Sequence, residues 1–574
     1  MHLKVSPNIN GDYLSIVHKY KDPASKISKT KTIKSLGYLE ALKKSYADPI
    51  KHFKEVVAEM NAKEAERKAE TAVRLTLNET LTPDTSAGKR INLGYAAISK
   101  LFYALKLDGF FTSRDRRFKS NFAMANIVKT EVYSRILCPG SKKRTYELKD
   151  RYFERNNYKL DDVYRCLSQV AELENDLKLW LYETVTALIG KRNTEVCYYD
   201  VTNYYFEIDE ADELRKKGVS KEHRPDPIIQ MGLLTDAEGI PLNYKLFAGN
   251  TNDCETYRPT IAAAKSDFSL GRTVIVADKG LNTSDNIAYE LICNDGYIFS
   301  QTIRGANAEL KAYVLDAEGY TDYGIEGYRV KSRVYPREIN ATDIHGKKKS
   351  VRIDEKQVIF YSPEYDKRAK YERAEAVAKA RDMVKNPSKY NRATSHGAAK
   401  YVQNLAFDKK TGEVLPDAAK LLLFNAERLK EEESLDGFYA IVTSECDESD
   451  GKIIELYKGL WKIEEAFKIT KSTLNARPVY LSTQNHIKAH FAICYIALVI
   501  SRLLERTLNG KYPISRIAES LNSVCGTLAG ENIYVFDYCD EVTVCVEKTM
   551  RIPLTKRYLT PKDIREIVGN TKKY

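Results

Sequence analysis

The chain has 574 residues, about four domain lengths, and its 43% hydrophobic and 30% charged residues exclude a disordered protein. The 91 Lys and Arg outnumber the 79 Asp and Glu, and the net charge is +12. The excess lies at the front, since residues 1–54 carry +7, residues 89–155 carry +10 and the remainder carries −5. A basic front end indicates a polyanion partner, with nucleic acid as the first candidate.

The ten Cys residues form no C-x-x-C pair, which excludes a disulfide framework and favours a reducing, intracellular compartment. The first 21 residues lack the apolar core of a secretory signal. The most apolar run, 489–504, contains Arg502 and is shorter than the roughly 20 residues that cross a bilayer, so it predicts a buried helix. We therefore expect a cytoplasmic protein.

Along the first third of the chain, alternating residues around Asn10-Gly11 predict a hairpin, and a charged helix is expected at about 48–70. Helical periodicity follows over 92–190. Two basic clusters in this stretch are expected in loops: Arg114, Arg116, Arg117 and Lys119, and then Lys142, Lys143 and Arg144.

From residue 195 the pattern changes to short apolar and aromatic runs. Strands are predicted at 196–206, 228–234 and 242–247, a helix at about 255–268, and a strand that is apolar on both faces at 273–277. A continuous apolar strand belongs in the middle of a helix-covered sheet. Three strands, a helix and a buried strand are the order of a ribonuclease-H-like α/β core.

Residues 305–445 interrupt this core as a β-rich insertion with a charged helix from Lys367 to about Lys385. A strand at 438–442 is expected to return to the core, and helices at 453–472 and 485–505 complete the α/β layer. The tail, 511–574, is expected to mix a helix with a strand pair.

Asp200 and Asp278 each follow an apolar strand, and the topology predicts that these two strands are neighbours. Carboxylates at such positions are partly desolvated, which is costly unless they bind something. Together with a third carboxylate they can hold two Mg²⁺ ions about 4 Å apart, which act on the attacking and leaving oxygens of a phosphodiester. The alternative is that each Asp only caps a strand-to-loop turn.

The helix at 453–472 is expected to supply the third carboxylate. Its apolar stripe, which would dock on the sheet, consists of Leu456, Leu460, Ile463 and Phe467. A second stripe beside it consists of Tyr457, Trp461, Glu464, Lys468 and Lys471. Glu464 then lies at the edge of the core with Lys residues for a phosphate backbone, whereas Glu465 points toward solvent. The alternative is an amphipathic helix with a solvated face.

Three motifs resemble those of insertion-sequence DDE transposases of the IS-four type: YYDVTNYYF at 198–206, VIVADKGLNTSDN at 274–286 and YKGLWKIEEAFKITK at 457–471. The likeness extends over nearly the whole chain. It implies a ribonuclease-H-like mixed sheet with flanking helices, a β-rich insertion and a preceding basic, mostly helical DNA-binding region.

The resemblance also implies that Asp200, Asp278 and Glu464 are the catalytic, metal-binding triad, with two Mg²⁺ ions for which Mn²⁺ could substitute. Tyr457 and Lys471 match the signature residues expected to contact the transposon end. The predicted DNA-binding set is Tyr457, Trp461, Lys468, Lys471, Arg114, Arg116, Arg117, Lys142, Lys143 and Arg144.

One position departs from the family signature, Y-x2-R-x3-E-x6-K, because Leu460 stands where the Arg belongs. A complete signature occurs elsewhere, at Tyr365, Arg368, Glu372 and Lys379. The helix around Glu372 lacks a large apolar stripe and so cannot give a metal ligand rigid support. We therefore predict Glu464, and not Glu372, as the third acid.

The leading prediction is a transposase that binds the ends of an insertion sequence, cleaves phosphodiester bonds and joins the 3′-hydroxyl ends to target DNA. One alternative is a structure-selective nuclease or resolvase of the same fold, which would lack a dedicated end-binding domain. Another is an inactive DNA-binding derivative, which would not retain three scattered acids. No Walker loop, G-x-G-x-x-G motif or nucleophile elbow occurs, so nucleotide cofactors have no support.

The expected partners are double-stranded DNA, as transposon ends and target, and a second copy of the chain in the DNA complex, with no membrane. A prokaryotic host is expected, with the protein on the nucleoid when DNA-bound. The expected organisation is a basic N-terminal region (1–88), a helical DNA-binding domain (89–190), a catalytic core in two segments (191–304 and 446–510), the insertion (305–445) and a C-terminal region that is a candidate for dimerisation (511–574).

Overall fold

The computed structural model describes residues 1–21, 28–68, 90–222, 224–324, 326–342, 346–386, 389–390, 397–403, 422–529 and 532–573. The chain divides into two compact units. The first is Met1–Thr85 with Ala529–Ile533, and the second is Ser86–Leu528 with Tyr534–Tyr574.

The N-terminal unit contains a three-stranded antiparallel sheet and a long helix. The predicted turn at Asn10-Gly11 joins the first two strands, and Gly11 has a φ of +104°, in the left-handed region that favours glycine. Both the hairpin and the charged helix are confirmed. The elements are β1 (His2–Ser6), β2 (Tyr13–Lys21), β3 (Ser28–Tyr38), α1 (Leu39–Leu42) and α2 (Pro49–Lys68).

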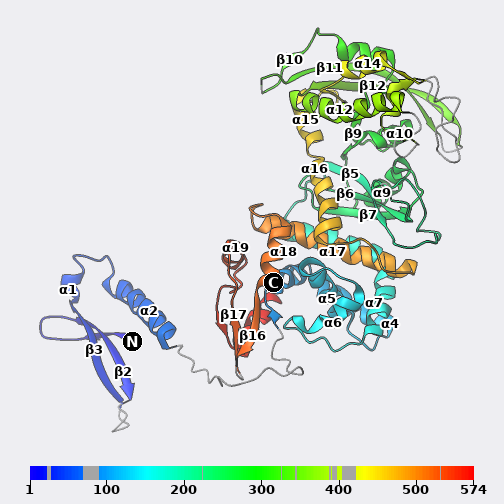
Figure 1. Ribbon diagram of the computed structural model, residues 1–574. Coiled ribbons are helices and arrows are strands. Elements are labelled where there is room, and N and C mark those ends of the chain that lie inside the picture. The colour runs from blue at the N-terminus through cyan, green and yellow to red at the C-terminus, as the bar shows by residue number, and fades with distance from the viewer. Residues whose placement is uncertain are drawn as a thin grey trace. The chain divides into compact units, whose positions relative to one another are not determined.

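The second unit is built on a mixed nine-stranded sheet with the order β10-β11-β12-β15-β9-β8-β5-β6-β7 (Figure 1). Strands β5, β6 and β7 are antiparallel, and β8 and β9 run parallel to β5. The predicted strands and the predicted adjacency of β5 and β8 are confirmed. The strands are β5 (Val196–Tyr205), β6 (Ile228–Thr235), β7 (Pro241–Ala248), β8 (Val274–Ala277), β9 (Gly296–Gln301), β10 (Thr321–Asp322), β11 (Arg329–Thr342), β12 (Lys348–Tyr361) and β15 (Phe438–Thr443).

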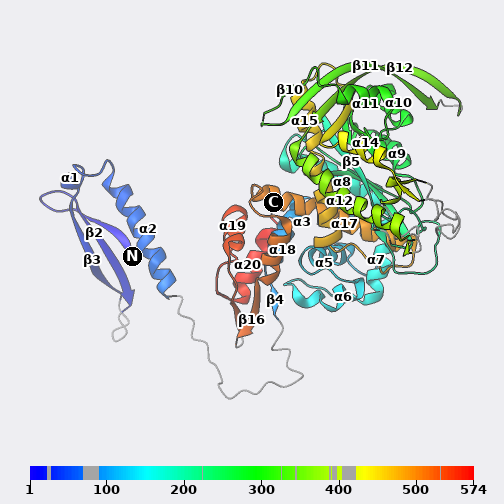
Figure 2. The ribbon, with the colours of Figure 1, turned by 45° about the horizontal axis from the view of Figure 1, so that its top comes forward.

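The insertion extends this sheet. Strand β15 returns to the core as predicted and pairs with β9, and β12 pairs with β15, so the long β11–β12 hairpin adds to the same sheet. Figure 2 shows the hairpin running out beyond the other strands. The remaining insertion elements are α11 (Ala308–Leu315), α12 (Pro363–Lys385), η5 (Ala399–Tyr401), β13 (Val402–Gln403), β14 (Leu423–Phe424) and α14 (Ala426–Ser434).

Helices cover both faces of the sheet because successive strand side chains point to opposite faces. Cys197 and Ile275 belong to the core on the face covered by α9 (Asp253–Phe268) and α10 (Ser284–Ile292). Tyr198 and Val276 belong to the core that includes Ile463. This second face is covered by α15 (Asp450–Lys458) and α16 (Trp461–Lys468).

The prediction of one continuous helix over 453–472 was wrong. The chain forms α15, breaks at Gly459 and Leu460, continues as α16 and ends in a π-helical turn, η6 (Ile469–Thr473). The break lies where the backbone approaches β5, since a Cβ at Gly459 would be 1.9 Å from the Tyr198 hydroxyl oxygen. The predicted apolar stripe still docks, with Leu460, Ile463 and Phe467 buried.

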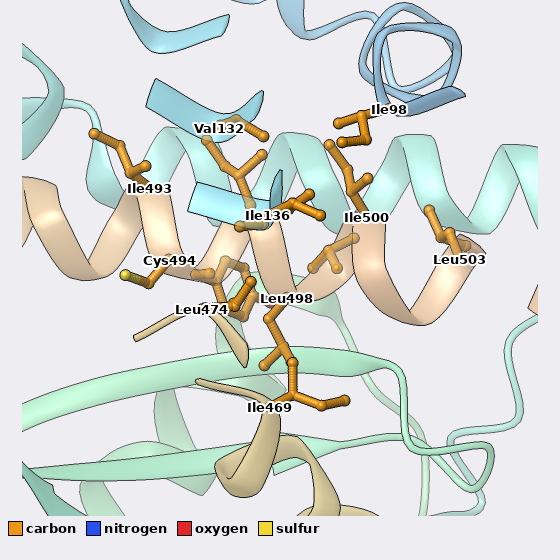
Figure 3. Close-up of a cluster of buried hydrophobic side chains, with 14 of the residues drawn as sticks. Ile98, Val132, Ile136, Ile469, Leu474, Ile493, Cys494, Leu498, Ile500 and Leu503 are labelled. Carbon is orange, nitrogen blue, oxygen red and sulfur yellow. The ribbon is translucent and has the colours of Figure 1, made fainter. Parts of the chain in front are cut away.

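Helix α17 (Gln484–Thr507) is the predicted apolar helix, and it lies between the sheet and the N-terminal helices of this unit. Figure 3 shows Ile493 and Ile500 on the side of Val132 and Ile136, while Leu498 lies toward η6. The helix is long and apolar enough to cross a membrane, but 94% of its most apolar window is buried inside the protein. It is therefore a core helix.

The helices predicted over 92–190 are present and share one hydrophobic core with α17. They are α3 (Tyr95–Ala104), α4 (Leu107–Phe118), α5 (Met124–Leu137), α6 (Lys142–Glu147), η2 (Lys149–Arg151), α7 (Leu160–Glu172) and α8 (Glu174–Ile189). The tail has three helices instead of the single one expected. Its elements and the short strand that pairs with them are α18 (Ile514–Ser523), β16 (Cys525–Ala529), β17 (Ile533–Phe536), α19 (Glu541–Met550), β18 (Tyr558–Leu559), α20 (Pro561–Thr571) and β4 (Ile91–Asn92).

Candidate active site

Two of the three predicted acids lie side by side on neighbouring parallel strands, Asp200 within β5 and Asp278 directly after β8. The register pairs Tyr198 with Val276, and two residues further along, Asp200 comes opposite Asp278. Adjacent strands are about 4.8 Å apart, and residues two apart share a face. Both carboxylates therefore lie on the face covered by α15 and α16.

Asp200 is half-buried near the middle of β5, and its Oδ1 accepts a hydrogen bond from the Val201 N–H at 2.7 Å. Burial raises the pKa of this carboxyl to about 6, and the negative charge of Asp278 contributes to the rise. The Lys221 ammonium opposes it. Desolvation and a neighbouring like charge are the conditions under which a carboxylate gains most from a bound cation.

Asp278 directly follows β8 and precedes the short helix η3 (Lys279–Leu281). The hydroxyl of Ser300, on β9, donates a hydrogen bond to its Oδ1 at 2.8 Å. Tyr457 lies beside the pair. Burial raises the pKa of Tyr457, with further contributions from Tyr439 and the charge of Asp278, while a hydrogen bond with Ser300 lowers it.

Glu464 lies on the exposed side of α16, which runs along β5 and β6. Burial raises the pKa of Tyr439, and the negative charges of Asp278 and Glu464 add to the rise. Within the described parts of the chain, Glu464 has no ion-pair partner. The prediction that Glu465 points toward solvent was wrong, because Glu465 is the less exposed of the two and pairs with Arg502 of α17 at 2.7 Å.

The three acids do not converge on a single point. Among the residues that the structure describes, no three His, Cys, Asp or Glu side chains lie close enough together to hold one metal ion. Like-charged carboxylates repel one another. The positive charge of Lys221 offsets part of the negative charge of Asp200. Of the three acids, Asp200 and Asp278 lie on adjacent strands, and their carboxylate oxygens are the donors that a hard divalent cation prefers.

Glu372, the acid of the alternative signature, lies outside this site. It is exposed on α12 and pairs with Arg368 at 2.8 Å. The first residue of that signature, Tyr365, does reach the site edge, where it stacks on Tyr439 at 5.4 Å between ring centroids. Seven helical residues, or about 10 Å, separate Tyr365 from Glu372.

Lys471 lies close to the aspartates. It belongs to the π-helical turn η6, a kind of distortion that is frequent at functional sites. Burial lowers the pKa of Lys471 to about 8, the charge of Lys221 lowers it further, and Asp200 opposes the shift. Its ammonium lies 3.2 Å from Glu222, which also contacts the Arg477 guanidinium.

The other predicted DNA-binding residues of this helix differ in position. Lys468 is exposed. Trp461 is also exposed, but it lines a surface pocket with Glu465 and Arg502, on the side of α16 that faces α17.

The basic clusters expected in loops are helical instead. Arg114, Arg116 and Arg117 lie on α4, and Arg114 and Arg117 lie near acids of the following helices, Asp176 at 3.8 Å and Glu172 at 4.0 Å. The hydrophobic half of α4 anchors it in the core, so its basic end forms the last turns of a helix, where cations are favoured.

The DNA-binding role predicted for Lys142 was wrong. Lys142 is buried in α6 and pairs with Glu131 of α5 at 2.7 Å. Its neighbours Lys143 and Arg144 are exposed. In the first turn of α6, Lys142 therefore points into the protein interior, while Lys143 and Arg144 point into solvent.

Four residues at the site were missed by sequence reasoning: Lys221, Glu222, Ser300 and Arg477. Lys221 and Glu222 belong to the long β5–β6 connection, and the partner of Glu222, Lys471, lies 249 residues further along the chain. Arg477 could have been considered because it lies only four residues after the end of η6. No local pattern in the sequence marks Ser300.

Two family models match the chain. A model of the transposase DDE domain matches residues 209–500, and a model of the N-terminal domain of IS1634 family transposases matches residues 3–72. The first match includes Asp278 and Glu464 and begins after Asp200. No curated protein matches.

Among solved structures, a chain of the piggyBac transposase synaptic complex with hairpin DNA is similar at a TM-score of 0.34 and 10% identity. The likeness covers 85% of this chain and 87% of that chain. At that score it is distant.

The DDE-domain match spans just over half of the chain, so the chain belongs to the family of DDE transposases. With the N-terminal match, it is an insertion-sequence transposase, an enzyme that binds, cleaves and joins DNA with the help of a divalent metal, typically Mg²⁺.

The raised pKa of Asp200 predicts an acid limit for cleavage. A carboxylate binds a divalent ion only when deprotonated, and the pKa of about 6 lies above the ordinary 3.8. We expect Mg²⁺-dependent cleavage to fall about tenfold per pH unit below pH 6, as follows from one proton blocking one ligand. Because protons and metal compete, raising the Mg²⁺ concentration should move the midpoint of the rate–pH profile to lower pH. A midpoint that is independent of Mg²⁺ would contradict this assignment.

Proposed function

We propose that Asp200, Asp278 and Glu464 are the catalytic triad of this transposase and that the enzyme is of the IS-four type. The observation that carries the proposal is the alignment of Asp200 and Asp278 at one register on adjacent parallel strands, on the face that α16 covers. Glu464 is the candidate for the remaining ligand, because it lies on α16, which covers this face, and because its charge, like that of Asp278, raises the pKa of Tyr439. Among the described residues it has no ion-pair partner.

The proposed ligands would hold two Mg²⁺ ions, or Mn²⁺ in their place, which would activate the attacking oxygen and stabilise the leaving oxygen of a phosphodiester. Ser300 orients Asp278 by its hydrogen bond, and such outer contacts fix the direction of a ligand. Lys471, in the turn after Glu464, supplies a positive charge for the DNA backbone beside Asp200.

The proposed substrate is double-stranded DNA, first as the ends of an insertion sequence and then as the target. The N-terminal region (1–88) and the helices of 89–190 are proposed to bind the ends, because the basic residues are concentrated there. A homodimer is proposed to hold two ends, with 305–445 and 511–574 as its contact regions, in the cytoplasm of a prokaryotic host and on its nucleoid.

The deciding experiment incubates the full-length protein with labelled DNA that carries an insertion-sequence end, with Mg²⁺ or with EDTA, and maps the cut strands. We expect metal-dependent cuts at the boundary of the end, followed by joining of the freed 3′-hydroxyl to a target plasmid. Cuts placed by DNA structure alone, with no joining, would favour the nuclease alternative. No cutting of any end would favour an inactive derivative.

A further inference from the structure

The connection between β5 and β6, residues 206–227, is much longer than an antiparallel pair requires, since such strands are commonly joined by two to five residues. It is tied down at its base, where the Phe206 N–H donates to the Pro227 carbonyl at 2.9 Å. Near its far end the buried hydroxyl of Ser220 accepts hydrogen bonds from the N–H groups of Glu222 and Arg224, both at 3.2 Å. These hydrogen bonds fix the backbone of Glu222 and Arg224 relative to Ser220.

The turn places one carboxylate between two cations of the active-site edge. Oε1 of Glu222 lies 3.2 Å from the Lys471 ammonium and also contacts the Arg477 guanidinium. The side chains are 26% exposed for Glu222, 15% for Lys471 and 25% for Arg477. A charge cluster this far withdrawn from solvent is screened much less than a surface pair.

More positive charge surrounds this carboxylate than it can balance. The guanidinium of Arg224 lies 4.0 Å from the centre of the Tyr205 ring, and that of Arg477 lies 5.7 Å from the same ring. Lys471 lies 5.8 Å from the Tyr204 ring. Glu222 thus lies between two cations, Lys471 and Arg477, while Arg224 on the Tyr205 ring pairs with Asp226 at 3.7 Å.

The neighbouring residue of the same connection, Lys221, lies near Asp253 and the strand that carries Asp200. The Lys221 ammonium donates to the Val201 carbonyl and lies 3.9 Å from Asp253, and its charge acts on Asp200. The connection therefore places the Lys221 ammonium near Asp200 and the Glu222 carboxylate against Lys471 and Arg477. A bound metal ion would likewise bring positive charge to Asp200, and a DNA phosphate would bring negative charge to Lys471 and Arg477.

A glutamate carboxylate and a phosphodiester can each bind Lys471 and Arg477. Both offer a pair of anionic oxygens, and arginine binds carboxylate and phosphate with the same planar donors. A backbone phosphate entering here would meet the negative charge of Glu222, and the two cannot share Lys471 and Arg477.

We propose that Lys471 and Arg477 form a binding site for one phosphate of the DNA backbone beside Asp200, and that Glu222 occupies this site in the free protein and leaves it when DNA enters. The inference rests on the proposed function, because it takes Asp200 as part of the active site. Glu222 acts as an internal competitor, so the free enzyme holds its DNA-binding cations masked.

The test measures binding of a short labelled duplex to the full-length protein by fluorescence anisotropy in EDTA. Removing the competitor should tighten binding about five- to tenfold for Glu222→Gln, the change expected when a partly buried ion pair no longer has to be broken. Glu222→Ala, the second variant, should show the same gain. The matched control is Glu210→Gln, which makes the same charge change at an exposed residue of the same connection and should alter affinity by no more than about twofold.

The gain must depend on the cations. In the Arg477→Ala or Lys471→Ala background, Glu222→Gln should add little, because coupled residues give non-additive effects. Equal affinities for the Glu222→Gln and Glu210→Gln variants, or a gain that persists without Arg477 and Lys471, would overturn the proposal. Since binding is read in EDTA, failure of the proposed function appears separately, as absence of Mg²⁺-dependent cleavage.

Discussion

Asp200→Asn and Asp278→Asn should each lower the rate of Mg²⁺-dependent DNA cleavage by about a thousandfold or more. Each change would remove one proposed anionic metal ligand at equal size. Metal ions supply several kcal/mol of transition-state stabilisation, where 1.36 kcal/mol is a factor of ten. Duplex affinity in EDTA should change little, because the proposed role of each aspartate is to bind metal and not a phosphate. Single-turnover cleavage of labelled end DNA, together with binding by anisotropy, measures both quantities.

Glu464→Gln should join this class, and Glu372→Gln is its control. Glu372 is exposed and pairs with Arg368 four residues earlier, a contact worth a few tenths of a kcal/mol, so its loss should leave cleavage unchanged. An inactive Glu372→Gln variant together with an active Glu464→Gln variant would show that the complete signature on α12 carries the third acid.

Much of the catalytic sheet could be predicted from the sequence because its strands have strong local signals. The continuous apolar run of β8 marks a strand buried on both faces, and an acid directly after it has few structural explanations. The adjacency of Asp200 and Asp278 followed from strand order alone. The same reasoning located β15 and α17, because their apolar sequences predict burial in the core.

The parts that sequence reasoning missed depend on contacts between distant segments. Helical periodicity runs through Gly459 without interruption, and only the hydroxyl of Tyr198, some 260 residues earlier, shows why the helix breaks there. Likewise, Glu222 reads as one more charge in a polar connection until the fold brings Lys471 and Arg477 to it. A local pattern describes what an element is, but not which surface it meets.

The basic cluster at 142–144 illustrates the same limit, because its three adjacent cations have different surroundings. Ser141 caps α6 by accepting a hydrogen bond from the Arg144 N–H, which fixes the rotation of the helix. That rotation directs Lys142 into the interior against Glu131 and leaves Lys143 and Arg144 exposed. Burial lowers the pKa of Lys142, while the charge of Glu131 opposes the shift, so the ammonium depends on this carboxylate.

Lys142→Met should therefore lower the free energy of unfolding by about 3–5 kcal/mol, because it leaves Glu131 buried without its partner. Urea unfolding followed by circular dichroism measures this loss. The double variant Lys142→Met/Glu131→Leu should recover most of it, since an apolar pair of similar volume replaces a buried ion pair at little cost. Arg144→Ala should instead keep wild-type stability and weaken duplex binding, with a salt slope lower by about 0.9, the value for one phosphate contact. A Lys142→Met variant that is fully stable but binds DNA poorly would return Lys142 to the DNA-contacting surface and refute the structural role assigned to it.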